Sequence, residues 1–270
     1  MINIEGISLK EMLDKPEKVI VYTICSRLFE MALTSIESVA KNNSKICFCF
    51  LQSQDSFTDA QKSRLKEVVG NDNMILIIDV LKWCDIFDSL ICIRGQFISY
   101  TKLFIPILLR KLKLRKCLYL DEDTYCNGNI SKIYSIESSD KVFLGFCERG
   151  PVIDANTMLK KRFICSGLML IFDNNYDLER LAKVINYARF RNIRKLKNRR
   201  DQYIIASMDQ YGFIPLIKNL RRDMESLQKY ADWNYRWGIL GIYQLKDYNI
   251  FHYAKTYKIE DVEELLKIVA

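Results

Sequence analysis

Short apolar runs alternate with amphipathic stretches through the first 120 residues, and this alternation restricts the possible folds more than any other feature of the chain. The apolar runs have the length and residue content of buried strands. We predict strands at 19–24, 46–51, 74–80 and 116–123. Strands that alternate with helices are typical of an α/β domain with a mostly parallel central sheet.

The segments between these runs have apolar residues at helical spacing. We predict a helix at 31–40, a second at 58–69 capped by Thr58 or Asp59, and a third at 97–113 interrupted near Pro106. Further along, we expect strands at 141–147 and 163–171, a helical segment at 177–210, and a short strand or loop followed by a helix capped near Asp261.

No internal repeat and no Pro-, Gly- or Ser-rich linker divides the chain. We therefore expect one domain over residues 19–258, with an N-terminal extension at 1–18 and a C-terminal helix at 259–270. No apolar run approaches the roughly 20 residues of a membrane span, and the polar N-terminus does not resemble a signal peptide. These features predict a soluble, cytoplasmic protein. Its nine cysteines lack a CxxC pair, which favours buried free thiols over a zinc ribbon.

The net charge of +8 arises partly from two basic clusters, at 110–116 and 189–200. Such clusters suggest an anionic partner, which could be nucleic acid, an acidic membrane face or phosphate groups, although a solvated helix face is an equally simple explanation. Aromatic residues do not interleave with the basic ones as a base-stacking surface requires, so we expect no nucleic acid partner.

Three consecutive acids, Asp121, Glu122 and Asp123, follow the apolar run that ends at Leu120. In open α/β sheets, ligands bind beyond the carboxyl ends of the strands. If the strand continues, Asp121 and Asp123 share one face, where they repel each other unless a cation lies between them. Mg²⁺ and Mn²⁺ take oxygen ligands and are commonly held by carboxylates together with substrate phosphates. A solvated turn is the alternative.

The segment ISYTKLFIPILLRKLKLRKCLYLDEDTYCNG, Ile98 to Gly128, resembles the retaining, metal-dependent glycosyltransferases of family 8, which include bacterial lipopolysaccharide glucosyl- and galactosyltransferases and glycogenin. Three later segments are similar to family motifs in the same order: FICSGLMLIFD at 163–173, RRDQYIIASMDQYGFIPL at 199–216, and FHYAKTYK at 251–258. The resemblance implies a GT-A type fold, a Rossmann-like domain that binds a nucleotide-diphosphate sugar.

The resemblance also implies a set of ligands for a divalent cation, Mn²⁺ or Mg²⁺. These are Asp121, Asp123 and His252, the only histidine of the chain. An imidazole nitrogen suits Mn²⁺, which accepts mixed nitrogen and oxygen ligation. The remaining implied contacts to a UDP-sugar donor come from Thr23, Ile24, Cys25, Lys102, Glu122, Ser166, Gly167 and Lys258, and the residues implied beside the reacting carbon are Asp201 and Gln202.

Two features depart from the family pattern. The loop after the first strand reads CSRLFE, where the family often has Asp and Tyr, and Lys255 stands where Gly is usual. We expect transfer of glucose or galactose from a UDP donor to a surface glycan or glycolipid, with retention of configuration. The alternatives are a degenerate, non-catalytic nucleotide-sugar binder and a transferase with a protein acceptor. A nucleotidyltransferase is disfavoured because the first loop has no Gly. The cluster at 189–200 could meet an anionic, lipid-linked acceptor at the inner membrane face.

Overall fold

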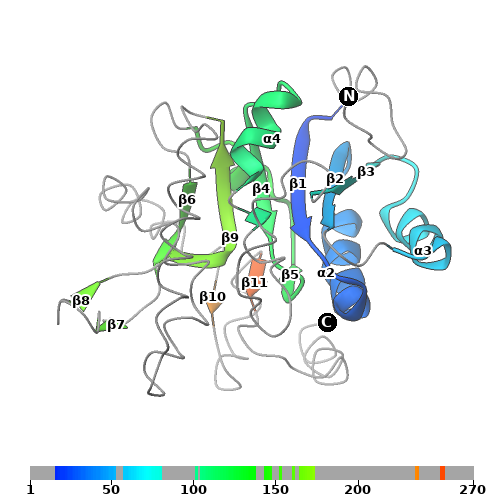
Figure 1. Cartoon of the computed structure of the whole chain (residues 1–270), viewed down its shortest axis with the longest axis horizontal. Coiled ribbons are helices and arrows are strands. Elements are labelled where there is room, and N and C mark those ends of the chain that lie inside the picture. The colour runs from blue at the N-terminus through cyan, green and yellow to red at the C-terminus, as the bar shows by residue number, and fades with distance from the viewer. Residues whose placement is uncertain are drawn as a thin grey trace.

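A six-stranded sheet forms the centre of the protein in the computed structural model (Figure 1). The strands lie in the order β3-β2-β1-β4-β9-β6, so that β3 and β6 form the two edges. Their bounds are Lys18–Thr23 for β1, Ile46–Gln52 for β2, Met74–Asp79 for β3, Lys116–Leu120 for β4, Phe143–Cys147 for β6 and Ile164–Phe172 for β9.

The structure describes ten stretches of the chain. These are residues 16–52, 57–80, 101–102, 104–137, 143–147, 152–153, 160–161, 164–173, 235–236 and 250–252. For Arg27, 143–147, 152–153, 160–161, 164–166, 235–236 and 251–252, the backbone alone is described. The segment at 177–210, the extension before residue 16 and the C-terminal helix predicted near Asp261 lie outside these stretches.

The central sheet is mostly parallel. Strand β1 pairs in parallel with β2 and with β4, and β2 pairs in parallel with β3. Strand β9 is antiparallel to both of its neighbours, β4 and β6, and is the one reversed strand. The strand predictions at 19–24, 46–51, 74–80, 141–147 and 163–171 are confirmed to within a residue or two. The sheet interior is apolar because helices cover both of its faces, as expected for parallel strands.

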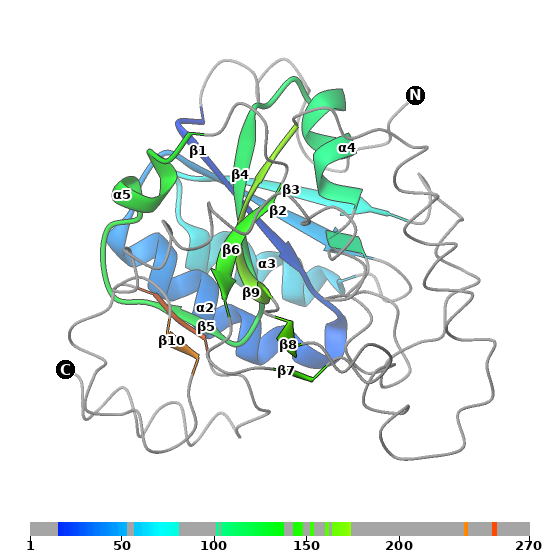
Figure 2. The ribbon, with the colours of Figure 1, turned by 90° about the vertical axis from the view of Figure 1, so that its left-hand side faces the viewer.

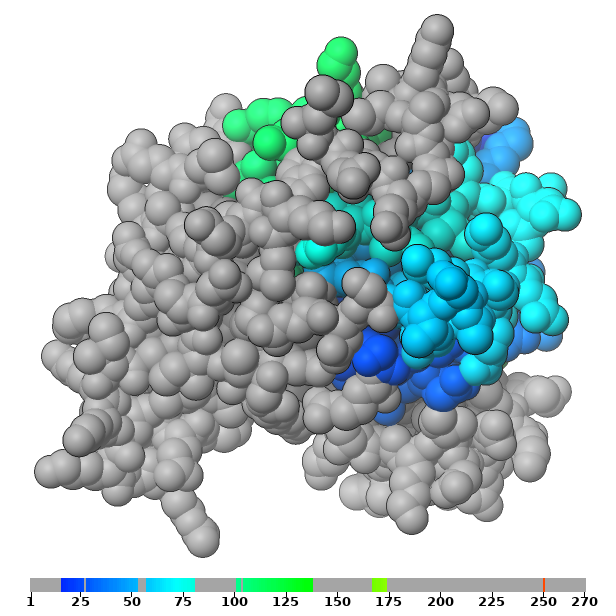
Figure 3. Space-filling view, turned by 45° about the vertical axis from the view of Figure 1, so that its right-hand side comes forward, coloured from blue at the N-terminus to red at the C-terminus, as the bar shows by residue number. Residues whose placement is uncertain are grey.

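Helices α2, Phe29–Asn42, and α3, Asp59–Val69, confirm two of the helix predictions. A short 3₁₀ turn, η1, at Ser26–Leu28 leads into α2. Helix α3 is capped by Thr58, whose side chain accepts from the Gln61 N–H while the Gln61 side chain accepts from the Thr58 N–H. It ends at Gly70, whose φ of +73° is strained for other residues. Helix α3 lies on the molecular surface (Figure 3) and buries only Leu65 and Val69.

The helix predicted at 97–113 is shorter than expected. Helix α4 spans Ile105–Lys111, with Pro106 in its first turn, where a proline is tolerated because the first N–H groups have no intrahelical partner. Thr101, Lys102 and Phe104 adopt the tighter 3₁₀ conformation before it. Pro106 therefore starts the helix and does not interrupt one. None of the helices in the described part of the chain is long and apolar enough to cross a membrane.

Helices α2 and α4 cover opposite faces of the sheet. Successive strand residues point to opposite faces. In β1, the Tyr22 hydroxyl lies 3.1 Å from Ser35 Oγ on α2, whereas Thr23 Oγ1 lies 2.8 Å from the Tyr119 hydroxyl on the other face. The Tyr119 ring in turn contacts Lys102, which lies three residues before the start of α4. Tyr22 and Thr23 therefore connect the end of β1 to both layers.

A second, three-stranded sheet lies beside α2 (Figures 1 and 2). It contains β10, Tyr235–Arg236, β11, Ile250–His252, and β5, Thr124–Cys126, in that order. Strand β11 confirms the alternative of a short strand near residue 250. Two further short strands, β7 at Val152–Ile153 and β8 at Lys160–Lys161, pair with each other. A four-residue helix, α5, spans Ser131–Tyr134.

The five cysteines whose side chains the structure describes are all buried and free: Cys25, Cys47, Cys49, Cys117 and Cys126. Burial raises the pKa of the Cys47 thiol to about 12 and that of Cys126 to about 11. A buried thiol with a raised pKa is a poor nucleophile and metal ligand, because both roles require the thiolate. These cysteines behave as small apolar side chains, as predicted.

Candidate active site at the carboxyl edge of the sheet

The acidic residues lie in a turn at the carboxyl end of β4. The strand ends at Leu120, and Glu122 and Asp123 form the turn that leads into β5. The prediction of a strand through residue 123 was therefore wrong, and strand alternation does not place Asp121 and Asp123 on one face. Asp121 N–H still donates to Gly167 O on β9, at 2.9 Å, so the pairing with β9 extends one residue beyond β4 before the turn begins.

Asp121 is held by two side chains that lie on the α4 side of the sheet. Lys102 Nζ lies 3.3 Å from Asp121 Oδ1, and the Tyr119 hydroxyl donates to the same oxygen. The Lys102 side chain is only 2% exposed, and its ammonium lies 4.8 Å from the centroid of the Tyr119 ring. A buried ammonium needs such partners, because burying an uncompensated charge is costly. Lys102, predicted to contact the donor, contacts the first carboxylate of the turn in this structure.

The first loop lies next to this pair. Thr23, Ile24 and Cys25 are all buried at the carboxyl end of β1, and Ile24 N–H donates to Leu51 O at 3.2 Å. Thr23 Oγ1 reaches the Tyr119 hydroxyl, which joins this strand end to Asp121. Burial and the neighbouring carboxylates raise the pKa of Tyr119 well above its usual value, so the hydroxyl stays protonated and can donate.

Negative charge is concentrated in the acidic turn. Burial, followed by the neighbouring Asp121 and Asp123 carboxylates, raises the pKa of Glu122 to about 8, and the Lys102 ammonium opposes this shift. Asp121, Glu122 and Asp123 are each half-buried. A divalent cation would relieve this repulsion, so the donor set fits an oxygen-liganded ion such as Mn²⁺ or Mg²⁺.

The strand that contains His252 lies beside the acidic turn. In the antiparallel pairing of β11 with β5, His252 is opposite Thr124, the residue that follows Asp123. Residues that lie 128 positions apart in sequence are therefore neighbours in the second sheet. A shared site of Asp121, Asp123 and His252 requires this backbone register. The His252 side chain itself lies outside the described part of the structure.

A chain of buried hydroxyl groups fixes the turn to α2. Thr124 Oγ1 donates to Asp121 O at 2.8 Å and lies 2.8 Å from Ser35 Oγ, which also contacts the Tyr22 hydroxyl. One turn further along α2, Ser38 Oγ accepts from Cys126 N–H at 2.9 Å. The position of β5, and with it the C-terminal side of the acidic turn, is therefore set by α2.

Several predicted site residues are not brought into this arrangement by the described part of the chain. Asp201, Gln202 and Lys258 lie outside it, and for Ser166 only the backbone, in β9 next to Gly167, is described. Within the described residues, no group of three or more His, Cys, Asp or Glu side chains is arranged to hold a metal ion.

Three supporting residues were not predicted from the sequence: Tyr119, Thr124 and Ser35. Tyr119 was visible as a polar-tipped side chain in the otherwise apolar run CLYL, two residues before Asp121. Buried tyrosines usually find a partner for the hydroxyl, and this could have pointed to Tyr119. Ser35 lies in the middle of a helix and Thr124 in a short strand, and no local signal marks either residue.

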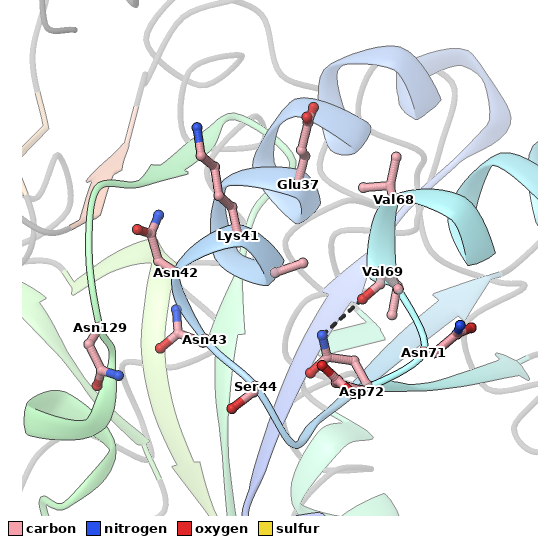
Figure 4. A pocket seen from close by; sticks show the side chains of 13 residues that line it. Glu37, Lys41, Asn42, Asn43, Ser44, Val68, Val69, Asn71, Asp72 and Asn129 are labelled. Atoms are coloured by element: carbon pink, nitrogen blue, oxygen red, sulfur yellow. Dashed lines mark hydrogen bonds between the residues drawn. The ribbon is translucent and has the colours of Figure 1, made fainter.

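An open hollow of about 630 Å³ lies at the other end of the strands, where β2 and β3 begin (Figure 4). It is lined by the C-terminal ends of α2 and α3 and by Asn129, near the start of β2 and β3. Its asparagines hold the scaffold together: Asn43 Nδ2 donates to Val39 O and Gly128 O, and Asn73 accepts from Ile46 N–H. Because ligands of open α/β sheets bind at the carboxyl ends of the strands, we place the candidate site at the acidic turn.

The chain is similar to known proteins in its sequence profile and in its fold. The sequence profile described as glycosyl transferase family 8 matches residues 19–261. No curated protein matches the chain by sequence. Among solved structures, the chain is similar to the WbbM bifunctional glycosyltransferase, with a TM-score of 0.60 and 14% identity over 95% of this chain and 50% of that one.

Two further structures are similar to the chain. GlyE of Streptococcus pneumoniae TIGR4 aligns with a TM-score of 0.57 and 13% identity, over 94% of this chain and 60% of its own. An active-site mutant of LgtC aligns with a TM-score of 0.59 and 12% identity, over 93% of this chain and 94% of its own. The chain thus spans half of WbbM and three fifths of GlyE, but nearly all of LgtC.

At these identities the structural likeness establishes the fold, which is of the GT-A type. The sequence profile covers nearly the whole chain and includes the acidic turn, the β9 segment and β11. The chain therefore belongs to glycosyl transferase family 8.

Proposed function

We propose that this protein transfers a hexose, glucose or galactose, from a UDP-sugar to an acceptor hydroxyl on a bacterial surface glycan or glycolipid, with retention of configuration. The observation that carries the proposal is the convergence of separate segments on the acidic turn. Lys102 pairs with Asp121, Gly167 O accepts from the Asp121 N–H, and β11 brings the His252 backbone opposite Thr124. The family membership supports the same chemistry.

A divalent cation fits this turn, because burial and, after it, the neighbouring Asp121 and Asp123 carboxylates raise the pKa of Glu122 to about 8. Asp121, Asp123 and His252 would hold the ion. When bound, it would supply Lewis-acid stabilisation of the negative charge on the departing diphosphate. We propose Lys258 as a fixed positive charge that acts on the same leaving group.

The remaining residues would bind and orient the donor. Thr23, Ile24 and Cys25 form the buried end of β1, where the nucleoside would lie. Ser166 and Gly167 would let the backbone approach the sugar closely, since Gly167 has no side chain. Lys102 would keep Asp121 in place and lie near the diphosphate. We propose Asp201 and Gln202 as the pair beside the reacting carbon.

The acceptor side of the proposal concerns the basic segment at 189–200. Its positive charges would attract an anionic acceptor, such as a phosphorylated lipid-linked oligosaccharide, at a membrane surface. Sedimentation with vesicles that contain anionic lipid tests this. Binding that is unchanged after the arginines of the segment are replaced by glutamine would contradict a role in membrane contact.

Hydrolysis of the donor without acceptor is the most direct test of the activity. We would measure release of UDP from UDP-glucose and UDP-galactose in the presence of Mn²⁺, for the native protein and for Asp123→Ala. We expect the rate to fall by about 100-fold or more in Asp123→Ala, which corresponds to roughly 2.7 kcal/mol of transition-state stabilisation. NMR of the transferred sugar would establish the anomeric configuration of the product.

Asp72→Ala is the matched control, because Asp72 is an exposed aspartate in the turn at the other end of the strands. It should retain the native rate. Equal rates for the native protein and Asp123→Ala would contradict the proposed site. Binding of UDP-sugar by the native protein without any turnover would favour the non-catalytic binder.

A further inference from the structure

The Tyr119 hydroxyl occupies a position between the acidic turn and the first loop. The Tyr119 side chain is fully buried in β4, and its hydroxyl donates to Asp121 Oδ1. The same hydroxyl lies 2.8 Å from Thr23 Oγ1. A phenol has a single proton to donate. Because that proton is directed to Asp121, the Thr23 hydroxyl must be the donor to Tyr119, and the three groups form a directed chain from Thr23 through Tyr119 to Asp121.

Two groups fix the same carboxylate oxygen. Lys102 Nζ lies 3.3 Å from Asp121 Oδ1 and 4.8 Å from the centre of the Tyr119 ring. The Tyr119 ring therefore supports the ammonium while the Tyr119 hydroxyl orients the carboxylate. Side chains that hydrogen-bond to a metal ligand set its orientation, and their loss typically lowers metal affinity by about 10- to 100-fold.

We propose that Tyr119 is a positioning residue that couples cation binding at Asp121 to nucleotide binding beside Thr23. This inference rests on the proposed function, because it takes Asp121 as a cation ligand and the end of β1 as the nucleoside site. A coupling of this kind is reciprocal: a cation that orders Asp121 and Tyr119 also orders Thr23, and a nucleotide held at Thr23 strengthens cation binding by the same factor.

The variant Tyr119→Phe removes one hydroxyl and keeps the buried ring and its contact with Lys102. Tyr134→Phe is the matched control. The Tyr134 hydroxyl accepts from Val19 N–H at 3.0 Å and donates to Lys116 O at 3.1 Å, at the other end of β1 and β4. Both variants lose a tyrosine hydroxyl that joins the same two strands, but only one of them touches the acidic turn.

Three quantities should be measured on the full chain: the Kd of Mn²⁺ alone by electron paramagnetic resonance, and the Kd of UDP by calorimetry without Mn²⁺ and at saturating Mn²⁺. We expect Tyr119→Phe to weaken Mn²⁺ binding by about 10-fold or more and to reduce the gain in UDP affinity that Mn²⁺ produces. Tyr134→Phe should match the native protein in both respects. A purely structural role for Tyr119 would not change the ratio of the two UDP affinities.

The outcomes separate this inference from the proposed function. If the native protein binds Mn²⁺ and UDP and Tyr119→Phe shows the same Mn²⁺ affinity and the same gain, the positioning role is wrong and the proposed function stands. If the native protein binds neither, both fail.

Should Tyr119→Phe not fold, Thr23→Val provides the second test, because it removes the first hydroxyl of the chain and keeps the side-chain shape. The inference then requires that Thr23→Val bind Mn²⁺ with the affinity of the native protein. It also requires that saturating Mn²⁺ increase the UDP affinity of Thr23→Val less than it increases that of the native protein. If Mn²⁺ increased the UDP affinity of Thr23→Val as much as that of the native protein, the inference would be wrong.

Discussion

Lys102 shows how much a single residue of the site could be predicted. Its resemblance to a basic family position pointed to a role near the donor diphosphate, but no sequence pattern indicates that its side chain is only 2% exposed or that its ammonium contacts Asp121. No sequence pattern indicates the partners of Tyr119 either, which come from β1, from the segment before α4 and from the acidic turn. Such contacts depend on tertiary packing, which local sequence does not encode.

Replacing Lys102 by Met should lower the free energy of unfolding by about 1–3 kcal/mol, because Asp121 would lose a charged partner in a largely buried position. Urea denaturation measures this. We expect saturating Mn²⁺ to narrow the difference from the native protein, since a bound cation would compensate the same carboxylate.

Lys45→Met is the control for Lys102→Met. Lys45 Nζ lies 3.1 Å from Glu17 Oε1, but both side chains are more than half exposed, so the pair is screened by solvent. We expect no measurable loss of stability in this variant. Native stability in Lys102→Met would show that the buried ion pair does not stabilise the acidic turn.

At the level of elements, the long apolar strands were predicted well, whereas β11 was the one short strand expected, as an alternative to a loop. Strands β1 and β2 are continuous apolar runs buried on both faces, and β3, at the edge of the sheet, is an apolar run that is largely buried on one face and half-buried on the other. Strands β5, β10 and β11 have two or three residues each and exist through pairing with one another. The helix predicted at 97–113 was too long because its apolar spacing continues upstream of Pro106, which in fact lies in the first turn of α4.

The attachment of β5 to α2 gives an element-scale prediction. Ser38 Oγ accepts from Cys126 N–H and donates to Ser35 O at 2.6 Å. Ser38→Ala would leave a buried backbone N–H without this acceptor, so we expect it to lower the free energy of unfolding by about 1–3 kcal/mol. Denaturation in urea, monitored by circular dichroism, would give this value.

The control for Ser38→Ala is Ser135→Ala. Ser135 Oγ makes the same kind of bond to a carbonyl three residues earlier, Lys132 O at 2.8 Å, but Ser135 is exposed and no described N–H depends on it. Ser135→Ala should leave the free energy of unfolding nearly unchanged. Equal losses in the two variants would mean that β5 is not anchored through Ser38.

For the whole molecule, the alternation of strands and helices predicted a mostly parallel sheet, and the structure confirms it. The strand order and the reversal of β9 could not be predicted, because they depend on how the chain crosses from one strand to the next, which the spacing of apolar residues does not specify. The order has a functional consequence. It places β1 and β9 on either side of β4, so that Thr23 and Gly167 flank the acidic turn.

Because both flanks of the turn belong to one sheet, a nucleotide diphosphate and a cation bound there should stabilise the whole fold. A ligand that binds only the folded state at 100 times its Kd adds about 2.7 kcal/mol, which raises Tm by roughly 5–10 °C for a chain of this size. We expect this shift for UDP with Mn²⁺ and a smaller one for UDP alone, for Mn²⁺ alone, or for UMP with Mn²⁺, because the diphosphate is the proposed cation ligand.

In Asp121→Asn the shift should nearly disappear. A GDP shift equal to that of UDP would contradict the choice of uridine, and an equal shift for UMP would contradict a cation bridge between the turn and a diphosphate.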